Sequence, residues 1–352
     1  MDYKTDFLRD IWYYGLPSKA LKPGQTMAKT FLNEPMLFGR TTAGEVFAVE
    51  NRCPHRSVPL DRGKFDGKEV SCGYHGWRFD PAGRCTAIPS LKDCPAQYLK
   101  NFCVRSYPVQ EADGNIWFYA ASEVRSQPGS QAAPKVDIPK VWGGNDRDYQ
   151  LITQLPFACG VDPAVVLLVD PAHIPFVHDS WWWASQQELT EEVKTFDPSP
   201  FGFTMRQHQL LDGNFFYRLL GKAPQVEISF YLPGIRVERI TSSRHMVCNV
   251  TMVTPVTETT TEVTNLLYTT FGWMPLVRPL FSLLANQFLN QDRAVIREPE
   301  HPWPSARAEI FIKDADTPVR WYYQLKREFA ASRAEQRPFV NPVKTQTLSW
   351  YS

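Results

Sequence analysis

Cys53-Pro54-His55 and Cys72-Gly73-Tyr74-His75 are the two stretches that decide the fold of the first part of this chain. Sixteen residues separate the two stretches, and each supplies one cysteine and one histidine. Two thiolates on one iron and two imidazoles on the other hold a [2Fe–2S] cluster, and the neutral imidazoles raise its reduction potential to roughly −150 to +300 mV. The pattern therefore predicts a cluster that passes electrons to an oxidising centre.

A structural zinc site is the alternative for the same four side chains, because two cysteines and two histidines are also a zinc ligand set. Zinc motifs usually place the two cysteines close together and the two histidines after them, whereas here each half supplies one of each. Glycines at the second loop, Gly73 and Gly76, let backbone N–H groups approach the cluster sulfurs. These features favour the cluster.

Length and charge limit the remaining possibilities. A chain of 352 residues predicts about two domains, each with its own core. Its 38 basic and 37 acidic residues nearly cancel, so nothing indicates nucleic acid or an anionic membrane as a partner. The sequence shows no signal-peptide pattern at its start and no run of eighteen apolar residues. We expect a cytoplasmic protein without stable membrane insertion, in which Cys85, Cys94 and Cys103 are ordinary reduced cysteines.

The patterns along the chain predict an α+β protein. Residues 1–125 alternate short β-rich runs with turn signals, which predicts a small antiparallel β domain with both metal loops at one end. Residues 126–147 lack apolar periodicity and are typical of a linker. Residues 148–352 form a mixed domain, in which the alternation from 226 to 270 predicts a curved antiparallel sheet with one buried face. Helices are expected at 162–169, 280–296 and 322–333.

A second candidate metal site lies in Asp170-Pro171-Ala172-His173-Ile174-Pro175-Phe176-Val177-His178. In a helix that starts at Asp162, Asp170 and His173 would share a face. His173 and His178 would point in different directions, so they converge on one ion only if the helix breaks, and Pro175 is expected to break it. Two imidazoles and a carboxylate form the triad of non-haem Fe(II) oxygenases.

The two motifs, C-x-H-x₁₆-C-x-x-H and D-x-x-H-x₄-H in this order, closely resemble those of the Rieske non-haem iron oxygenases. The resemblance covers nearly the whole chain and points to the terminal oxygenase (α) subunits. By length and motif spacing, the chain is most similar to the α-only monooxygenase and demethylase branch, with dicamba monooxygenase, vanillate O-demethylase and pheophorbide a oxygenase. It implies a catalytic domain of helix-grip type with flanking helices. It also implies cluster ligands and iron ligands at Cys53, His55, Cys72, His75, His173 and His178.

The resemblance further implies a third iron ligand and an electron route. Asp292 occupies the position of the family's carboxylate ligand, with Glu298 and Glu300 as competitors. Asp170 is implied to bridge His75 of one subunit to His173 of the next in a head-to-tail homotrimer. A carboxylate between two imidazoles would orient both. Many relatives carry Asn where this chain has Leu167, so the control of O₂ activation is expected to differ in detail.

Aromatic residues near the second motif suggest an apolar substrate pocket. The candidates are Phe176, Trp181, Trp182, Trp183, Leu167 and Phe281, with Phe271 and Trp273 nearby. We expect a hydrophobic, cyclic substrate of aromatic, terpenoid or steroid type. The tryptophans are equally compatible with a structural or subunit-interface role.

The resemblance implies that a separate reductase or ferredoxin passes electrons from NAD(P)H to the [2Fe–2S] cluster and on to a mononuclear Fe(II). There O₂ would be used to hydroxylate the substrate, and hydroxylation beside oxygen or nitrogen would give demethylation. No dinucleotide-binding fingerprint is seen in the chain, which agrees with a separate reductase. The alternatives are a cis-dihydroxylating dioxygenase, a plain electron carrier and a lipid-binding protein without oxygenase activity.

Overall fold

The computed structural model describes residues 7–92, 94–122, 133–142, 148–178, 189–209, 224–296 and 310–352. The chain divides into two compact units, one formed by Phe7–Pro139 and the other by Lys140–Ser352. The division falls inside the predicted linker 126–147, of which residues 126–132 and 143–147 lie outside the described residues. The domain boundaries expected from the sequence stay predictions.

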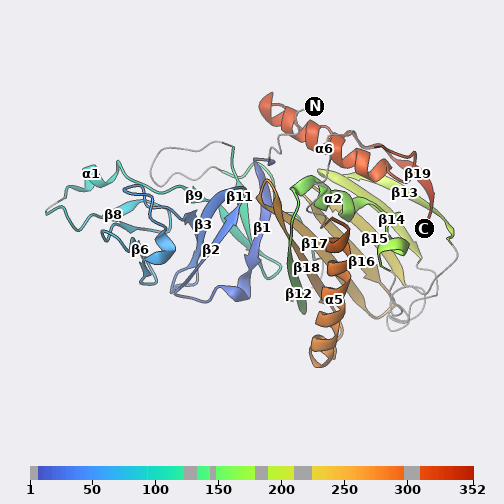
Figure 1. Ribbon diagram of the computed structural model, residues 1–352, viewed down its shortest axis with the longest axis horizontal. Helices are drawn as coiled ribbons and strands as arrows, with labels where there is room; N and C mark the ends of the chain where they lie inside the picture. The colour runs from blue at the N-terminus through green and yellow to red at the C-terminus, as the bar shows by residue number, and fades with distance from the viewer. Residues whose placement is uncertain are drawn as a thin grey trace. The chain divides into compact units, whose positions relative to one another are not determined.

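Three small antiparallel sheets build the first unit (Figure 1). One sheet has the order β1-β11-β10, the second β2-β3-β4-β9 and the third β5-β6-β7-β8. The strands are β1 (Ile11–Pro17), β2 (Gln25–Phe31), β3 (Glu34–Arg40), β4 (Val46–Glu50), β5 (Lys64–Phe65), β6 (Val70–Ser71), β7 (Arg78–Phe79), β8 (Cys85–Ala87), β9 (Ser106–Tyr107), β10 (Val109–Ala112) and β11 (Asn115–Ala120). Short helical turns, η1 (Ser18–Ala20), η2 (Leu60–Arg62) and α1 (Ala96–Leu99), connect them.

The predicted β-rich runs of the first unit are strands. Met36 to Gly39 lies in β3 and Val46 to Val49 in β4, and these two strands pair antiparallel. The turn predicted at Asp80 to Gly83 closes with a 2.8 Å hydrogen bond from the amide of Gly83 to the carbonyl of Asp80. Gly83 has φ +81°, a conformation that glycine adopts without strain. The residues of this turn therefore have the conformational preferences that the turn requires.

An eight-stranded antiparallel sheet forms the centre of the second unit, in the order β12-β18-β17-β16-β15-β14-β13-β19. Its strands are β12 (Leu151–Phe157), β13 (Glu191–Ser199), β14 (Gly202–Gln209), β15 (Gln225–Tyr231), β16 (Ile235–Thr241), β17 (Met246–Thr257), β18 (Thr260–Thr269) and β19 (Gln346–Tyr351). The helices are α2 (Val161–Val169), α3 (Ile174–Val177), α5 (Met274–Ile296) and α6 (Thr317–Ala334). Figure 1 shows α2, α5 and α6 lying against this sheet.

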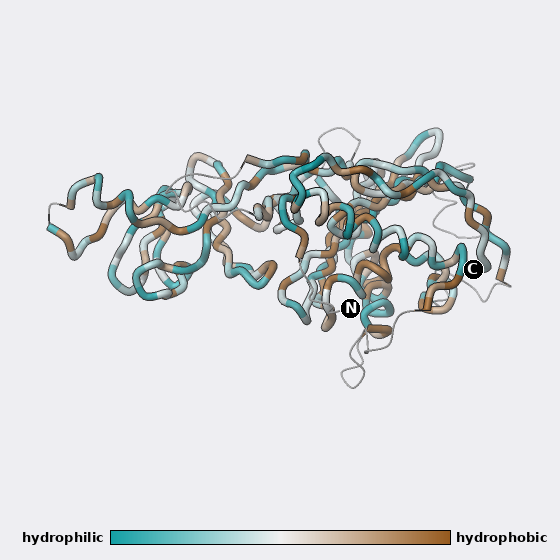
Figure 2. The backbone as a smooth tube through the Cα atoms, turned by 90° about the horizontal axis from the view of Figure 1, so that it is seen from above, coloured by the Kyte–Doolittle hydropathy of each residue, from teal (hydrophilic) through white to brown (hydrophobic). Residues whose placement is uncertain are grey.

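One face of the sheet packs against the helices, as the alternation predicted. Phe196 and Phe203 contact Trp321 of α6, with ring centroids 5.4 and 5.3 Å apart. A second apolar cluster joins the sheet to the start of α5 and contains Leu151, Val226, Ile240, Phe271 and Met274. Figure 2 shows hydrophilic and hydrophobic residues alternating within single segments, as expected for elements with one buried side.

Two of the predicted helices begin earlier than expected. α5 begins at Met274 rather than at 280, and α6 begins at Thr317 rather than at 322. Pro318 stands in the first turn of α6, where its missing N–H costs nothing. In α5, Pro279 is accommodated inside the helix at the loss of one backbone hydrogen bond. The prediction of helix starts at 280 and 322 was therefore wrong.

Candidate metal centres

The two cluster loops are tight turns with the same design. In the first, which follows β4, the amide of Cys53 donates to the carbonyl of Val58 at 2.9 Å and Ser57 donates to the carbonyl of Cys53 at 2.8 Å. In the second, between β6 and β7, Cys72 donates to the carbonyl of Trp77 at 2.8 Å. Each turn places its cysteine at the buried base and its histidine at the exposed tip.

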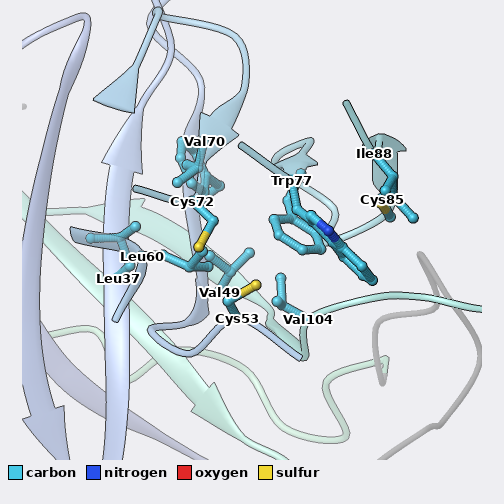
Figure 3. Close-up of a cluster of buried hydrophobic side chains, with 12 residues drawn as sticks. Leu37, Val49, Cys53, Leu60, Val70, Cys72, Trp77, Cys85, Ile88 and Val104 are labelled. Carbon is cyan, nitrogen blue, oxygen red and sulfur yellow. The ribbon is translucent and has the colours of Figure 1, made fainter. Parts of the chain in front are cut away.

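The sulfur atoms of Cys53 and Cys72 lie side by side among buried apolar side chains (Figure 3). Cys53 and Cys72 are 2% and 4% exposed and belong to the same core cluster as Trp77 and Val104. Burial raises the pKa of the Cys53 thiol to about 11, although hydrogen bonds from the backbone amides of His55 and Arg56 act in the opposite direction. These amides are positioned to stabilise negative charge on sulfur, as a metal thiolate requires.

The two histidines of the loops also lie together. The imidazoles of His55 and His75 have centroids 4.7 Å apart, and both side chains are exposed. The ring of His55 stacks on Trp77 at 5.0 Å with an angle of 5° between the planes. Two buried sulfurs and two exposed imidazoles therefore converge from opposite sides, which fits a cluster with one iron held by sulfur and the other by nitrogen.

Two glycines allow the chain at Arg62 and Gly63 to approach the second cluster loop closely. A Cβ on Gly63 would lie 1.8 Å from the carbonyl oxygen of Ser71, and one on Gly73 would lie 2.7 Å from that of Arg62. No side chain fits at those distances. The second loop thus depends on Gly73 for its position as well as for the approach of backbone N–H groups to the sulfurs that the sequence suggested.

The second candidate site is built around a break between α2 and α3. Asp170 ends α2 in an extended conformation, with φ −71° and ψ 116°, and Pro171 follows it. A residue before proline avoids the helical region, so the helix ends here. Pro175 lies in the first turn of α3, where proline is accepted, and does not break a helix. The prediction that Pro175 makes the break, and that Asp170 and His173 share a helical face, was wrong.

Both histidines are oriented through their Nδ1 atoms. Nδ1 of His173 lies 2.7 Å from the carbonyl oxygen of Asp170, and Nδ1 of His178 lies 3.2 Å from the amide oxygen of Gln291. Because both partners are acceptors, each Nδ1 carries the proton and each Nε2 keeps its lone pair. His178 is 1% exposed and its ring stacks on Phe288 at 3.6 Å. The imidazoles are thus held as metal ligands usually are.

The carboxylate of Asp292 completes the site from α5. Its Oδ1 lies 3.1 Å from Nε2 of His178 and 3.7 Å from Nε2 of His173. The ligand atoms of the three residues all lie within 4.8 Å of one another. Asp292 Oδ1 is buried and accepts no hydrogen bond in the described part of the chain. Three acceptors that face one another need a cation between them, so the residues fit a divalent iron.

Burial also sets the charge of this site. It lowers the pKa of His173, and the nearby carboxylates of Asp292 and Asp170 only partly oppose the effect. Burial raises the pKa of Asp170, whose Oδ1 accepts a 2.8 Å hydrogen bond from the amide of Ala172. A neutral imidazole is the form that binds metal. The carboxylate of Asp170 fixes the turn, whereas its carbonyl orients His173.

The remaining predicted site residues are more scattered. Phe176 is 67% exposed, Leu167 is half-buried on α2, and Phe281 packs against the apolar cluster at the start of α5. Trp181, Trp182, Trp183, Glu298 and Glu300 lie outside the described residues. Their roles in a pocket or as ligands stay predictions, as do the ligand roles of the residues at both metal sites.

Two residues near the iron site were missed by the sequence analysis. Gln291 and Phe288 contact His178, but nothing in the sequence separated them from other residues of a polar helix. The signal that was available is their position next to Asp292, one residue and one helical turn before it. Such a signal becomes useful only when Asp292 is already suspected as a ligand.

Comparisons with known proteins agree with this geometry. Residues 11–108 match the family described as Rieske [2Fe-2S] domain. The chain is 38% identical over 122 residues to the toluene-4-sulfonate monooxygenase system iron-sulfur subunit TsaM1 of Comamonas testosteroni, which covers 35% of this chain and 34% of the relative. It is 37% identical over 135 residues to the 4beta-methylsterol monooxygenase of Methylococcus capsulatus, covering 38% and 36%. The aligned segment thus spans about a third of these curated relatives.

The likeness of the fold extends further. The solved structure of dicamba monooxygenase bound to 3,6-dichlorosalicylic acid matches with a TM-score of 0.72 and 21% identity, over 93% of this chain and 98% of that chain. Residues 11–108 therefore belong to the Rieske [2Fe-2S] domain family, and the chain as a whole has the fold of dicamba monooxygenase. The [2Fe–2S] cluster is the cofactor of the first unit.

Proposed function

We propose that this protein is a terminal oxygenase component that hydroxylates a C–H bond of a hydrophobic, cyclic substrate. The observation that carries the proposal is the meeting of His173, His178 and Asp292 in a chain that also contains a Rieske domain. A mononuclear Fe(II) held by two imidazoles and one carboxylate keeps positions open for O₂. Insertion of one oxygen atom consumes one O₂, two electrons and two protons, and the second oxygen atom leaves as water.

The residues of the site have separate tasks in this proposal. His173 and His178 present neutral Nε2 atoms, which the carbonyl of Asp170 and the amide of Gln291 hold in place. Asp292 supplies the negative charge that compensates part of the charge of the metal. The 1% exposure of His178 and the Phe288 ring stacked on it keep water away from that side of the site.

Electrons would enter from a separate reductase or ferredoxin through the exposed imidazoles of the cluster loops. His75 is exposed, and so is its neighbour Tyr74 at 62%. The carboxylate of Asp170 uses Oδ1 for the turn, and its Oδ2 lies 3.9 Å from Nδ1 of His173. We infer that this carboxylate bridges to His75 of a neighbouring subunit in a head-to-tail homotrimer, as the resemblance implies.

Hydroxylation beside an oxygen or nitrogen substituent would lead to demethylation by loss of the hydroxylated carbon. Two of the similar proteins carry the word monooxygenase in their names.

The described residues contain no helix that is both long and apolar enough to cross a membrane. We propose a cytoplasmic setting, because the cysteines of the described residues are all free thiols.

Metal analysis tests the proposal. Protein purified anaerobically should contain about three irons and two acid-labile sulfides per chain, with a Rieske-type EPR signal after reduction. The reduced protein, given ¹⁸O₂ and a panel of cyclic substrates, should release a product with one labelled oxygen. Two labelled oxygens would indicate cis-dihydroxylation. A protein with two irons that binds no added Fe(II) would be an electron carrier or a binding protein.

A further inference from the structure

The large sheet carries a group of polar side chains on one of its faces. Residues paired directly across antiparallel strands share a face. Thr251 of β17 pairs with Arg236 of β16 on one side and with Asn265 of β18 on the other, and Asn265 pairs with Thr153 of β12. In the adjacent row of the same face, Glu238 pairs with Asn249. We call these six residues the polar band: Arg236, Glu238, Asn249, Thr251, Asn265 and Thr153.

The polar band lies on the face that the helices cover. Leu267, which pairs with Asn249, packs against the apolar cluster that includes Met274 and Phe281 of α5. At another border, Phe230 pairs with Arg236, and its ring lies 5.9 Å from that of Tyr322 on α6. The helices therefore pack around the polar band with apolar side chains.

Helix α2 connects the border at Phe230 and Arg236 to the iron site. Val165 of α2 lies against Gly234 and so borders the next row of the sheet, whose members include Val253. α2 leads directly into the break that carries His173. α5 packs on β12, contacts the apolar cluster through Met274 and Phe281, and carries Asp292 about 16 Å beyond Phe281, at 1.5 Å per residue. The polar band thus lies between the apolar cluster and the helix ends that hold the iron ligands.

Two asparagine side chains of the polar band do not use all of their hydrogen-bonding groups within the band. Nδ2 of Asn265 donates to Oδ1 of Asn249 at 2.8 Å and to Oγ1 of Thr251 at 2.9 Å. Within the described residues, this leaves the oxygen of Asn265 without a donor and the N–H groups of Asn249 without an acceptor. Both side chains are half-buried. Groups of this kind on a covered face usually have a partner, and water or a ligand can supply it here.

The charges of the polar band cancel. Arg236 and Glu238 form an ion pair of 3.0 Å, and their side chains are 20% and 16% exposed. An anionic group would gain little from an Arg236 that is already compensated, and it would meet the carboxylate of Glu238. A hydroxyl or a carbonyl would bind to the asparagines without bringing an unpaired charge under the helices.

We propose that the polar band recognises one neutral hydroxyl or carbonyl group of the substrate, while the apolar cluster with Phe281 and Leu267 contacts its hydrocarbon body. The substrate class is therefore an apolar cyclic alcohol, phenol or ketone, held so that a carbon remote from this group faces the iron ligands. The inference rests on the proposed oxygenase function, and it adds the residues that select the substrate: Asn249 and Asn265 first, with Arg236 and Glu238 as a fixed neutral neighbour.

Binding of three matched compounds tests this assignment without turnover. Naphthalene, 2-naphthol and 2-naphthoate share one ring system and differ only in the group attached to it. Equilibrium dialysis with the oxidised holoprotein, without reductase, should show 2-naphthol bound about tenfold more tightly than naphthalene, a ratio expected for well-made hydrogen bonds. It should also show 2-naphthoate bound more weakly than 2-naphthol. Equal affinities, tighter binding of 2-naphthoate, or no binding of any of the three would overturn the proposal.

Variants locate the effect. N265L should reduce the preference for 2-naphthol over naphthalene to about one, and N249V should reduce it in the same direction if N265L does not fold. The control is Q154L, because Gln154 lies on β12 next to Thr153 and its amide donates to Thr264 on the other face of the sheet. The preference should persist in Q154L, and its persistence in N265L and N249V would contradict the assignment. A correct preference in a protein that forms no product would instead refute the oxygenase function alone.

Discussion

The amide oxygen of Gln291 lies 3.2 Å from Nδ1 of His178, and Gln291 directly precedes Asp292 on α5. One helical segment thus supplies a candidate iron ligand and also orients a second ligand. Replacing Gln291 with Leu should lower the affinity for Fe(II) about 10- to 100-fold, the effect usual for the loss of a group that orients a metal-bound histidine. Fe(II) titration of the metal-depleted second site measures this affinity.

The control for this prediction is Q291E, which keeps an acceptor at the same position and should retain more affinity than Q291L. The Rieske EPR signal should be the same in both variants, because Gln291 belongs to the second unit. Equal Fe(II) affinity in Q291L and the unchanged protein would show that His178 needs no orienting partner.

Removal of the carboxylate itself should have a larger effect. Asp292→Ala takes away the only negative ligand among the three residues that meet at this site. We expect the iron content to fall from about three to about two per chain while two sulfides remain, since the four residues proposed as cluster ligands are unchanged in this variant. Iron and sulfide analysis with EPR provides the measurement. A variant that still holds the third iron would shift the ligand role to another carboxylate.

A variant of Asp170 can test electron delivery without changing metal binding in our proposal. Asp170→Asn keeps the carbonyl that orients His173 and an oxygen that can accept from the amide of Ala172. The iron content should therefore stay unchanged. Reoxidation of the reduced cluster by O₂ in the presence of substrate should become about tenfold slower or more, because the charged bridge is lost. Stopped-flow absorbance follows the cluster, and an unchanged rate would argue against the bridge.

The close approach of Gly63 to Ser71, directly before the second cluster loop, gives a stability prediction. Gly63→Ala would place a methyl group 1.8 Å from the carbonyl oxygen of Ser71, so the backbone at Gly63 and at Ser71 must separate. We expect a loss of about 1–3 kcal/mol in the free energy of unfolding of the first unit, and a loss of cluster on storage. Gly272→Ala is the matched control, because its Cβ would meet nothing within 4 Å. Similar thermal unfolding of both variants would contradict the close contact.

Acid should weaken the connection between α6 and the chain that follows it. Glu328 accepts hydrogen bonds from Arg337, one of them 2.9 Å long, and Arg337 lowers the pKa of Glu328 to about 2. A lowered pKa means that the pair stabilises the fold at any pH above the ordinary value of 4.5 and loses this effect as the pH falls toward 2. The stability difference between the unchanged protein and E328Q should therefore shrink across this range. Urea unfolding at several pH values measures it.

Features that depend on residues close together in the sequence could be predicted. The two cluster loops are closed by hydrogen bonds between residues about five apart, so the motif and its glycines contain most of the information. The alternation from 226 to 270 likewise predicted strands, because each residue reports its own face. The break between α2 and α3 was assigned to the wrong proline. Pro171 restricts the residue before it, whereas Pro175 begins a helix, and position relative to the helix start decides between these effects.

Relationships across strands and helices could not be predicted. The polar band depends on the register of four strands, and shifting one strand by a single residue would move its member to the other face. The contact of Gln291 with His178 joins residues that are 113 positions apart. Neither relationship leaves a local pattern in the sequence, and both appear only when the sheet and α5 are in place.

The candidate iron ligands are far apart in the sequence, so the affinity for Fe(II) should depend on how much of the second unit is folded. His173 and His178 flank a single short helix and come together locally, whereas six of the described strands, β13 to β18, lie between them and Asp292 in the sequence. An unfolded chain therefore brings together at most two of the three candidate ligands. Tight Fe(II) binding should begin at the same step of refolding as the native sheet, and any variant that loosens the sheet should release iron before its helices melt.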